Sequence, residues 1–394
     1  MKLAGRLDQI EPFYVMECAK AAAEMARSPV CDPALGGRRM LYLNIGEPDF
    51  VAPLAVQQAA RDCINTGSTQ YLPATGLPAL RRAVSGWYRQ RFDLDIAAER
   101  IVITAGASAA LQLACLALFE RGDEVLMPDP CYPCNRHFVA ATDALAVLLP
   151  AGPEQRFQPG SAQVCAAWNP ATRGVLLASP SNPTGTSIAP QEMQAIVEAV
   201  RARGGVTIVD EIYLGLSYDA RFERSALEFG DDVISVNSFS KYFGMTGWRL
   251  GWLVLPPELV APVEKLTQNL FICASSIAQY AALACFEPAS IAEYERRRQA
   301  FRERRDYIVP ALQALGLKVP VMPDGAFYVW IDCSDFSSDS WKFAFDLMQS
   351  SQLALTPGRD FGRTGSERWL RLSFASSMDD LQEAVRRLAV ALHR

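Results

Sequence analysis

The feature that most constrains the fold is the stretch from residue 101 to 256, where short apolar runs alternate with helix-like segments. The apolar runs are continuous, which is typical of strands that are buried on both faces. One helix-like segment, 190–203, begins with a proline and ends before a glycine pair. The sequence therefore predicts an α/β fold with a mostly parallel sheet covered by helices on both faces. The predicted strands are 101–105, 124–128, 144–149, 174–178, 206–210, 233–237 and 250–255.

The chain has 394 residues, a length that favours two domains over one core. After residue 285 the pattern changes to a long arginine-rich helix-like segment followed by strand-like stretches. The arginine run is most simply explained as the solvated face of a helix. We predict a large domain at 46–285 and a smaller α+β domain at 286–394, which the N-terminal segment 1–45 joins.

Composition excludes several classes of partner. The net charge is −5, and no basic tract of the kind that binds nucleic acid or an anionic membrane is present. No apolar run approaches the ~18 residues of a membrane span, and charged residues interrupt the N-terminus, which is unlike a signal peptide. We therefore expect a cytoplasmic protein that acts on small molecules.

Histidine and cysteine usage limits the chemistry. The two histidines, His137 and His393, are too few for a histidine-rich metal centre, and His137 lies in no nucleophile-elbow context. The ten cysteines form no disulfide framework, and Cys131 and Cys134 have no second CxxC to complete a zinc site. We expect no metal, and cysteines that pack as reduced thiols. An enzyme of this composition must move protons with another residue type.

Polar motifs follow or close five of the predicted strands. Because ligands bind at the carboxyl ends of strands in an open parallel sheet, we expect these motifs to form one site. Their shared position indicates a ligand site more strongly than any one of them does. The motifs are TAGAS (104–108), PDPCYP (128–133), SPSNPTG (179–185), VDEIY (209–213) and NSFSK (237–241).

Lys241 lies among small and aromatic residues without a carboxylate nearby in sequence. The other five lysines lie in charged or helical surroundings, where a solvated head group is the simplest explanation. Desolvation and neighbouring positive charge lower the pKa of such an amine, so that it can lose its proton near neutral pH. Asp210 ends a strand and, taken alone, is explained equally well as a cap. Together, the amine can condense with an aldehyde and the carboxylate can hold a pyridine nitrogen protonated.

These residues are part of a longer series of motifs that resembles the class I/II pyridoxal-phosphate-dependent aminotransferases, of the fold-type I, aspartate aminotransferase-like superfamily. The resemblance covers nearly the whole chain. It implies an enzyme that carries pyridoxal 5'-phosphate and moves the amino group of an L-α-amino acid to a 2-oxo acid by a ping-pong mechanism. The further motifs are NIGEPDF (44–50), YLPATGLPALR (71–81), SFSKYFGMTGWRLGW (238–252), PDGAFYVW (323–330) and WLRLSFA (369–375).

The resemblance assigns roles around the cofactor ring. Lys241 would form the aldimine with the cofactor and serve as the base, and Asp210 would pair with the pyridinium nitrogen. Tyr213 would hydrogen-bond the phenolic oxygen of the ring, with Asn182 beside it. Tyr132 would stack on the ring, although a tyrosine that merely packs after a turn is the alternative.

The resemblance also places the cofactor phosphate. Ala107 and Ser108 open a helix directly after a strand, where backbone N–H groups and the helix dipole favour an anion. Ser238 and Arg249 would add a hydroxyl and a guanidinium. Tyr71 would reach the phosphate of the neighbouring subunit, which implies a homodimer with shared active sites.

Three residues are assigned to the substrate carboxylate. Arg371 lies on the predicted strand 369–375, where a fixed guanidinium suits bidentate capture of a carboxylate, and a structural ion pair is the alternative. The resemblance adds Asn182 and the backbone of Gly46. Ser108 stands where some members carry a lysine for a distal carboxylate, which weakens an aspartate preference.

An apolar pocket is expected for the substrate side chain. We therefore expect a neutral or aromatic amino donor, with 2-oxoglutarate or pyruvate as the acceptor. The candidate lining residues are Phe13, Tyr14, Met245 and Phe327.

Three other functions fit parts of the pattern. A β-lyase on the same fold would share the lysine chemistry but expel a substituent from Cβ. A pyridoxal-phosphate-binding transcription regulator normally carries an N-terminal DNA-binding module, for which we expect no room before residue 44. A nicotinamide dehydrogenase would need a GxGxxG motif after a strand, which the sequence lacks.

Overall fold

A seven-stranded sheet forms the centre of the computed structural model, which describes residues 2–392. Its strands are β2 (Ile101–Thr104), β3 (Glu124–Asp129), β4 (Leu145–Pro150), β5 (Thr172–Ala178), β6 (Val206–Asp210), β7 (Val233–Ser238) and β8 (Gly251–Val254). They lie in the order β2-β8-β7-β6-β5-β3-β4. β8 runs antiparallel to both of its neighbours, and the other strand pairs are parallel. The predicted strands and the mostly parallel sheet are confirmed. Of the two histidines, His393 lies outside the described residues.

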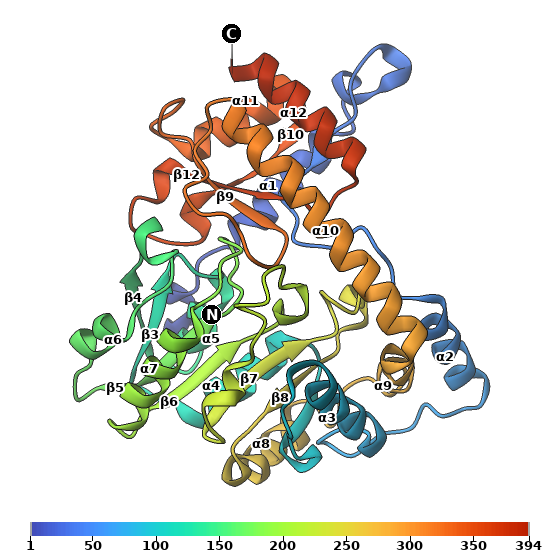
Figure 1. The fold of residues 1–394 in the computed structure, drawn as a ribbon, viewed down its shortest axis with the longest axis vertical. Coiled ribbons are helices and arrows are strands. Elements are labelled where there is room, and N and C mark those ends of the chain that lie inside the picture. The colour runs from blue at the N-terminus through green and yellow to red at the C-terminus, as the bar shows by residue number, and fades with distance from the viewer. Residues whose placement is uncertain (1, 393–394) are drawn as a thin grey trace.

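Helices cover both faces of this sheet (Figure 1). Leu176 and Ile208 pack on one face with α4, α5 and α8, whereas their neighbours Val175 and Val209 pack on the other with α3, α6, α7 and α9. Because successive strand residues point to opposite faces, a sheet covered twice needs continuous apolar strands. The helices are α2 (Leu54–Asn65), α3 (Pro78–Phe92), α4 (Ala107–Leu118), α5 (Pro133–Ala140), α6 (Ser161–Ala167), α7 (Pro190–Arg201), α8 (Pro257–Leu270) and α9 (Ser276–Leu283).

A smaller part combines the two ends of the chain. Its strands are β1 (Leu41–Tyr42), β9 (Tyr328–Asp332), β10 (Leu353–Ala354), β11 (Thr356–Pro357) and β12 (Trp369–Ser373). β11, β12 and β9 form an antiparallel sheet, and β1 pairs with β10 in parallel. The helices are α1 (Tyr14–Met25), α10 (Pro288–Ala314), α11 (Ser340–Ser351) and α12 (Met378–Leu392). The predicted α+β character of this smaller part is confirmed, and the domain boundaries at 45 and 285 stay predictions.

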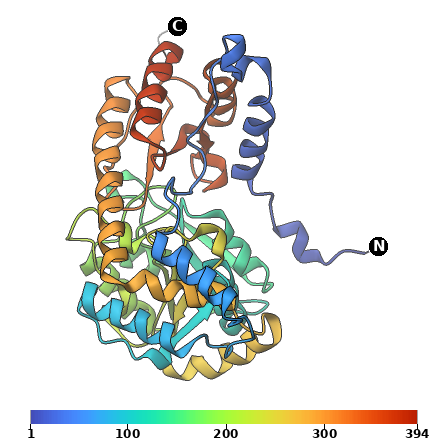
Figure 2. The ribbon, with the colours of Figure 1, turned by 90° about the vertical axis from the view of Figure 1, so that its right-hand side faces the viewer.

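The long helix α10 runs beside both the large and the small sheet, as Figure 2 shows from the side. The prediction that its arginine run is a solvated face is wrong for Arg297 and Arg304, which are 8% and 7% exposed. Arg304 binds both carboxylate oxygens of Asp49 at 2.8 Å and donates to the carbonyl of Ala375 at 2.9 Å. Because α10 lies against other elements, its arginines meet buried acceptors that a charge count along the sequence does not reveal.

Replacing Arg304 with alanine is expected to destabilise the protein by about 2–3 kcal/mol, because the change removes a buried side chain that bridges Asp49 to the carbonyl of Ala375. Arg302 on the same helix is exposed and lies 4.0 Å from Asp306, so Arg302→Ala is the matched control. That change should cost less than about 0.5 kcal/mol. Urea unfolding of both variants measures the difference, and equal losses would contradict the assignment.

Within residues 2–392, no helix has the length and apolar character needed to cross a membrane.

Candidate active site

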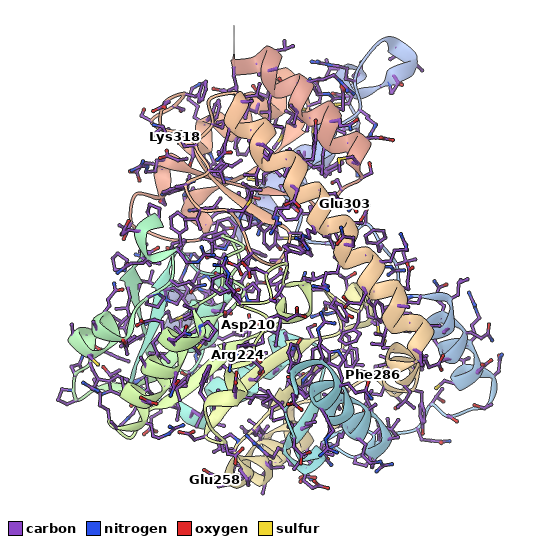
Figure 3. The ribbon with its side chains drawn as sticks, viewed as in Figure 1. Asp210, Arg224, Glu258, Phe286, Glu303 and Lys318 are labelled. Atoms are coloured by element: carbon purple, nitrogen blue, oxygen red, sulfur yellow. The ribbon has the colours of Figure 1, made fainter. Side chains whose placement is uncertain are left out.

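A cavity of about 270 Å³ opens at the carboxyl ends of the large-sheet strands. Asp210, at the end of β6, lies near the middle of the molecule between the large and small parts (Figure 3). The structure thus brings all five strand-end motifs to one place. The predicted site residues on the cavity wall are Gly46, Ala107, Ser108, Tyr132, Asn182, Asp210, Tyr213, Ser238, Lys241, Arg249 and Arg371.

Lys241 follows β7, and its Nζ donates a hydrogen bond to the carbonyl of Gly46 at 2.6 Å. Burial lowers the pKa of Lys241 to about 8; Glu47 opposes this change, and Arg371 and Arg249 add to it. A substantial fraction of the amine is therefore neutral slightly above pH 7. A neutral amine in a cavity can act as a nucleophile or as a base.

Asp210 is buried at the end of β6, where its Oδ1 accepts a hydrogen bond from the N–H of Ile212 at 3.2 Å. Burial raises the pKa of Asp210 to about 7; the hydrogen bond from Ile212 and the charge of Lys241 oppose this rise, whereas Glu211 adds to it. The carboxylate therefore lacks a strong cationic partner within the described chain. A ligand nitrogen that carries a proton would stabilise its charged form.

The protein without any bound ligand is expected to become more stable at pH 8 when Asp210 is replaced by asparagine. The folded-state pKa of about 7 exceeds the ordinary 3.8, so the folded protein holds this proton to higher pH than the unfolded chain. The wild type therefore loses stability as pH rises from about 4 to 7, by up to about 4 kcal/mol, and the variant does not. Urea unfolding at pH 4.5 and 8 measures this. The exposed Asp95 supplies the control Asp95→Asn, and a pH-independent effect of Asp210→Asn would contradict the prediction.

Arg371, on β12, is 2% exposed and has only neutral partners within the described residues. Nη1 donates to Asn182 Oδ1 at 2.8 Å, and Nη2 donates to the carbonyl of Asn44 at 2.5 Å. Nε is buried and has no acceptor there. The structural ion pair that the sequence left open is therefore not found. A buried guanidinium that lacks a counter-ion is suited to the carboxylate of a ligand.

The start of α4 combines several groups that favour an anion. Gly106 precedes the helix with φ +86°, and a Cβ at this position would lie 2.6 Å from Arg249 Nη2. The first N–H groups of the helix, at Ala107 and Ser108, have no acceptor within it, and the helix dipole favours negative charge there. Ser238 ends β7 on the same cavity wall. Backbone N–H groups, a hydroxyl and a guanidinium can together hold a phosphate group.

Tyr132 and Tyr71 occupy different surroundings. Tyr132 immediately precedes α5 on the cavity wall, where its ring makes an edge contact with that of Phe13 at 6.0 Å between centroids. Its stacking role stays a prediction. Tyr71 lies between α2 and α3, is 78% exposed and does not line the cavity of its own chain.

The predicted side-chain pocket needs correction. Phe13 lines the cavity, but Tyr14, Met245 and Phe327 do not. Tyr14 packs against Trp341, and Met245 and Phe327 are fully buried in the core, so the prediction is wrong for these three. An aromatic residue next to a site motif can pack in the core or face a ligand, and the sequence does not separate the two. The cavity residues that the sequence reasoning missed include Val15, Met16, Ile45, Ser240 and Tyr328.

Three of the missed residues lie inside motifs that the sequence had already singled out, and Ile45 of NIGEPDF is one of them. Ser240 stands between Ser238 and Lys241, and Tyr328 lies in PDGAFYVW. Val15 and Met16 carried no local signal, because only the tertiary fold brings this part of the N-terminal segment to the cavity.

The sequence and the fold both match known proteins. The profile of the family described as Aminotransferase class I and II matches residues 38–388. The chain belongs to this family. This aminotransferase is 39% identical to a valine–pyruvate aminotransferase of Mycobacterium tuberculosis over 380 residues, which are 96% of each protein. It is 32% identical to an aspartate/prephenate aminotransferase of Thermus thermophilus over 394 residues, covering 100% of this chain and 99% of the relative.

Solved structures give the same result. The crystal structure of an aminotransferase from Mycobacterium tuberculosis superposes with a TM-score of 0.94 at 38% identity and covers 100% of this chain and 99% of that one. Aspartate aminotransferase from Thermus thermophilus with maleate gives 0.92 at 31% identity, with 99% of each chain covered. The protein is therefore an aminotransferase, and the β-lyase alternative is not favoured.

Proposed function

We propose that this aminotransferase binds pyridoxal 5'-phosphate and moves the amino group of a neutral L-α-amino acid to a small 2-oxo acid in two alternating half-reactions. One observation carries the proposal. A single cavity contains a lysine of lowered pKa, a buried carboxylate and a buried arginine with no counter-ion in the described chain, namely Lys241, Asp210 and Arg371.

The cavity residues fit this cofactor at its charged groups. The start of α4, with Ser238 and Arg249, would hold the phosphate, and the glycine before α4 leaves the space that a Cβ would fill. Asp210 suits a ring nitrogen that carries a proton, and the hydroxyl of Tyr213 would bond the phenolic oxygen of the ring. When bound, pyridoxal phosphate supplies an aldehyde that takes up the amino group and a ring that delocalises the electron pair left at the substrate Cα.

The side chains of this chain would then position the substrate and move its proton. Lys241 would hold the cofactor covalently between turnovers. Its Nζ would remove the Cα proton, because burial keeps part of the amine unprotonated near neutral pH. Arg371 and Asn182, already joined by a 2.8 Å hydrogen bond, would hold the substrate carboxylate, with the backbone of Gly46 on the other side.

The cavity wall supports a neutral amino donor. Its cationic lining residues are Lys241, Arg249 and Arg371, each of which already has a role in the proposal. No further cationic side chain of the described chain lines the cavity to bind a distal carboxylate. The N-terminal segment adds an apolar wall, and the relative named valine–pyruvate aminotransferase supports a neutral donor and pyruvate as the acceptor. The wall consists of Phe13, Val15, Met16 and Ile45.

Spectroscopy of the purified protein tests the proposal. The protein is loaded with pyridoxal phosphate, freed of excess and mixed with single L-amino acids. Neutral amino acids should convert the absorption of the bound aldehyde form into that of the amine form, and pyruvate should reverse the change. If no amino acid produces it, the proposed function is wrong. Release of pyruvate and ammonia without an acceptor would instead indicate a β-lyase.

The predicted homodimer and cytoplasmic location stay predictions. The 78% exposure of Tyr71 supports a dimer in which this residue reaches the anion site of the other copy. Sedimentation velocity of the cofactor-loaded protein checks it, and a monomer at micromolar concentration would contradict it.

A further inference from the structure

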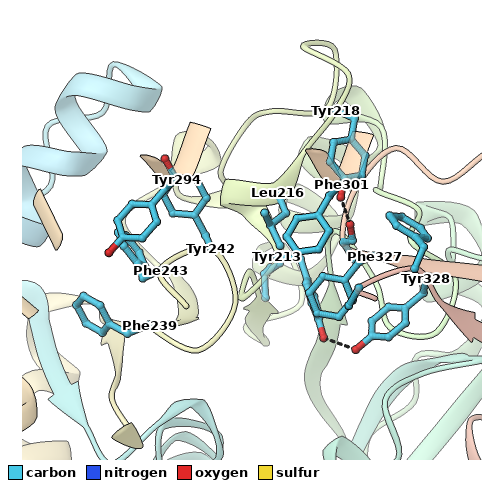
Figure 4. Packing of buried hydrophobic residues seen from close by; sticks show 14 of the residues in the cluster. Tyr213, Leu216, Tyr218, Phe239, Tyr242, Phe243, Tyr294, Phe301, Phe327 and Tyr328 are labelled. Atoms are coloured by element: carbon cyan, nitrogen blue, oxygen red, sulfur yellow. Dashed lines mark hydrogen bonds between the residues drawn. The ribbon is translucent and has the colours of Figure 1, made fainter. Parts of the chain in front are cut away.

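Tyr328 contacts groups from both parts of the molecule. It begins β9, where it pairs with Ser373 of β12, and its hydroxyl lies 2.7 Å from that of Tyr213, which follows β6 of the large sheet (Figure 4). Its ring lies 4.4 Å from the guanidinium carbon of Arg371. A Cβ at Gly46 would lie 2.0 Å from its hydroxyl oxygen, so Tyr328 also packs against the backbone that holds Lys241.

We infer, on the basis of the proposed function, that Tyr328 is a positioning residue: its hydroxyl orients the hydroxyl of Tyr213 toward the cofactor, and its ring holds Arg371 in place for the substrate carboxylate. The first part follows from hydrogen-bond counting. A phenol has one proton to donate, so if Tyr213 donates to the phenolic oxygen of the cofactor, its hydrogen bond with Tyr328 requires Tyr328 to donate and Tyr213 to accept. Within residues 2–392, these two hydroxyls are each other's only hydrogen-bond partners.

A chain of two hydroxyls strengthens the outer bond. Donation from Tyr328 polarises Tyr213 and makes it a better donor toward a negatively charged oxygen. Burial raises the pKa of both tyrosines, so both stay protonated and able to donate. The ring of Tyr328 acts on Arg371. This guanidinium lacks a carboxylate partner in the described chain, and the rings of Tyr328 and Phe361 lie against it and hold it in place.

Two substitutions separate the effect of the Tyr328 hydroxyl from the effect of its ring. Tyr328→Phe keeps the ring and removes the hydroxyl, so it should raise the pH at which the absorption of the lysine-bound cofactor titrates by about half a unit. The reason is that a weaker bond to the phenolic oxygen leaves its negative charge more localised, which favours the protonated nitrogen of Lys241. KM for the amino donor should change less than about twofold. Tyr328→Leu should also raise KM, by about tenfold.

Tyr213→Phe and the double variant show whether Tyr328 acts through Tyr213. Tyr213→Phe should shift the titration further than Tyr328→Phe, and Tyr328→Phe should add nothing in the double variant. The groups that surround the titrating nitrogen, Glu47, Asp210, Arg249 and Arg371, are unchanged in all of these proteins.

Tyr218→Phe is the matched control. Tyr218 is also buried, and its hydroxyl donates to the carbonyl of Ala326, outside the cavity (Figure 4). This variant should leave the titration and KM unchanged. A wild-type titration in Tyr328→Phe, together with a shifted one in Tyr213→Phe, would overturn the role of Tyr328 and leave the proposed function intact. Absence of any lysine-bound cofactor in the wild type would instead overturn the proposed function.

Discussion

Replacing Lys241 with alanine is expected to lower kcat/KM for every amino donor by about 10⁴-fold or more. In the proposed function, Lys241 supplies both the covalent attachment and the base that removes the Cα proton, and general base catalysis alone contributes about 10²- to 10⁴-fold. The fold should persist, because the side chain makes a single hydrogen bond, to the carbonyl of Gly46. Formation of the 2-oxo product, followed with a coupled assay, measures the loss.

Two controls separate this effect from general damage. Lys318→Ala removes an exposed lysine that pairs with Asp335 at 2.7 Å, each side chain being 54% exposed, and activity should change less than about twofold. Small primary amines added to Lys241→Ala should restore part of the rate in proportion to their concentration, since they supply the missing base. A variant within tenfold of the wild type would show that Lys241 is not the base.

Replacing Arg371 with leucine is expected to lower kcat/KM by about 10³-fold, mainly through KM. Truncating one partner of a buried charge pair costs about 2–5 kcal/mol. Asn182 and the carbonyl of Asn44 hold the Arg371 guanidinium on the cavity wall, where it would pair with the substrate carboxylate. Steady-state kinetics with a neutral amino acid measures the effect.

The substrate itself provides the decisive control for Arg371. A primary amine that lacks a carboxylate should react equally slowly with the wild type and with Arg371→Leu. Arg359 lies outside the cavity, against the rings of Tyr14 and Trp341 at 4.4 and 4.6 Å, so Arg359→Leu should stay within about twofold of the wild type. An equal loss for amines and amino acids would contradict carboxylate capture.

The sequence predicted those features that depend on local pattern. Continuous apolar runs gave the buried strands, and the polar residues at their ends converged because parallel strands share one edge. The lowered pKa of Lys241 was predicted from the same stretch, since small and aromatic neighbours desolvate the amine without offering it a carboxylate.

What the sequence did not predict depends on contacts between distant segments. The burial of Arg304 needs Asp49 and Ala375, which lie 255 and 71 residues away. The apolar wall that contains Val15 comes from the N-terminal segment, and the contact of Tyr328 with Tyr213 joins the two sheets. None of these pairings leaves a periodic or spacing signal in the chain.

Because α10 is one continuous helix, its length fixes the distance and the rotation between its two ends. Its 27 residues extend from the helices that cover the large sheet to the small sheet that carries Arg371. Inserting one residue near its middle would turn everything downstream by about 100° and advance it by about 1.5 Å. The number of residues in α10 therefore fixes how Arg371 on the small sheet is placed relative to Lys241 on the large part, although no residue of α10 lines the cavity.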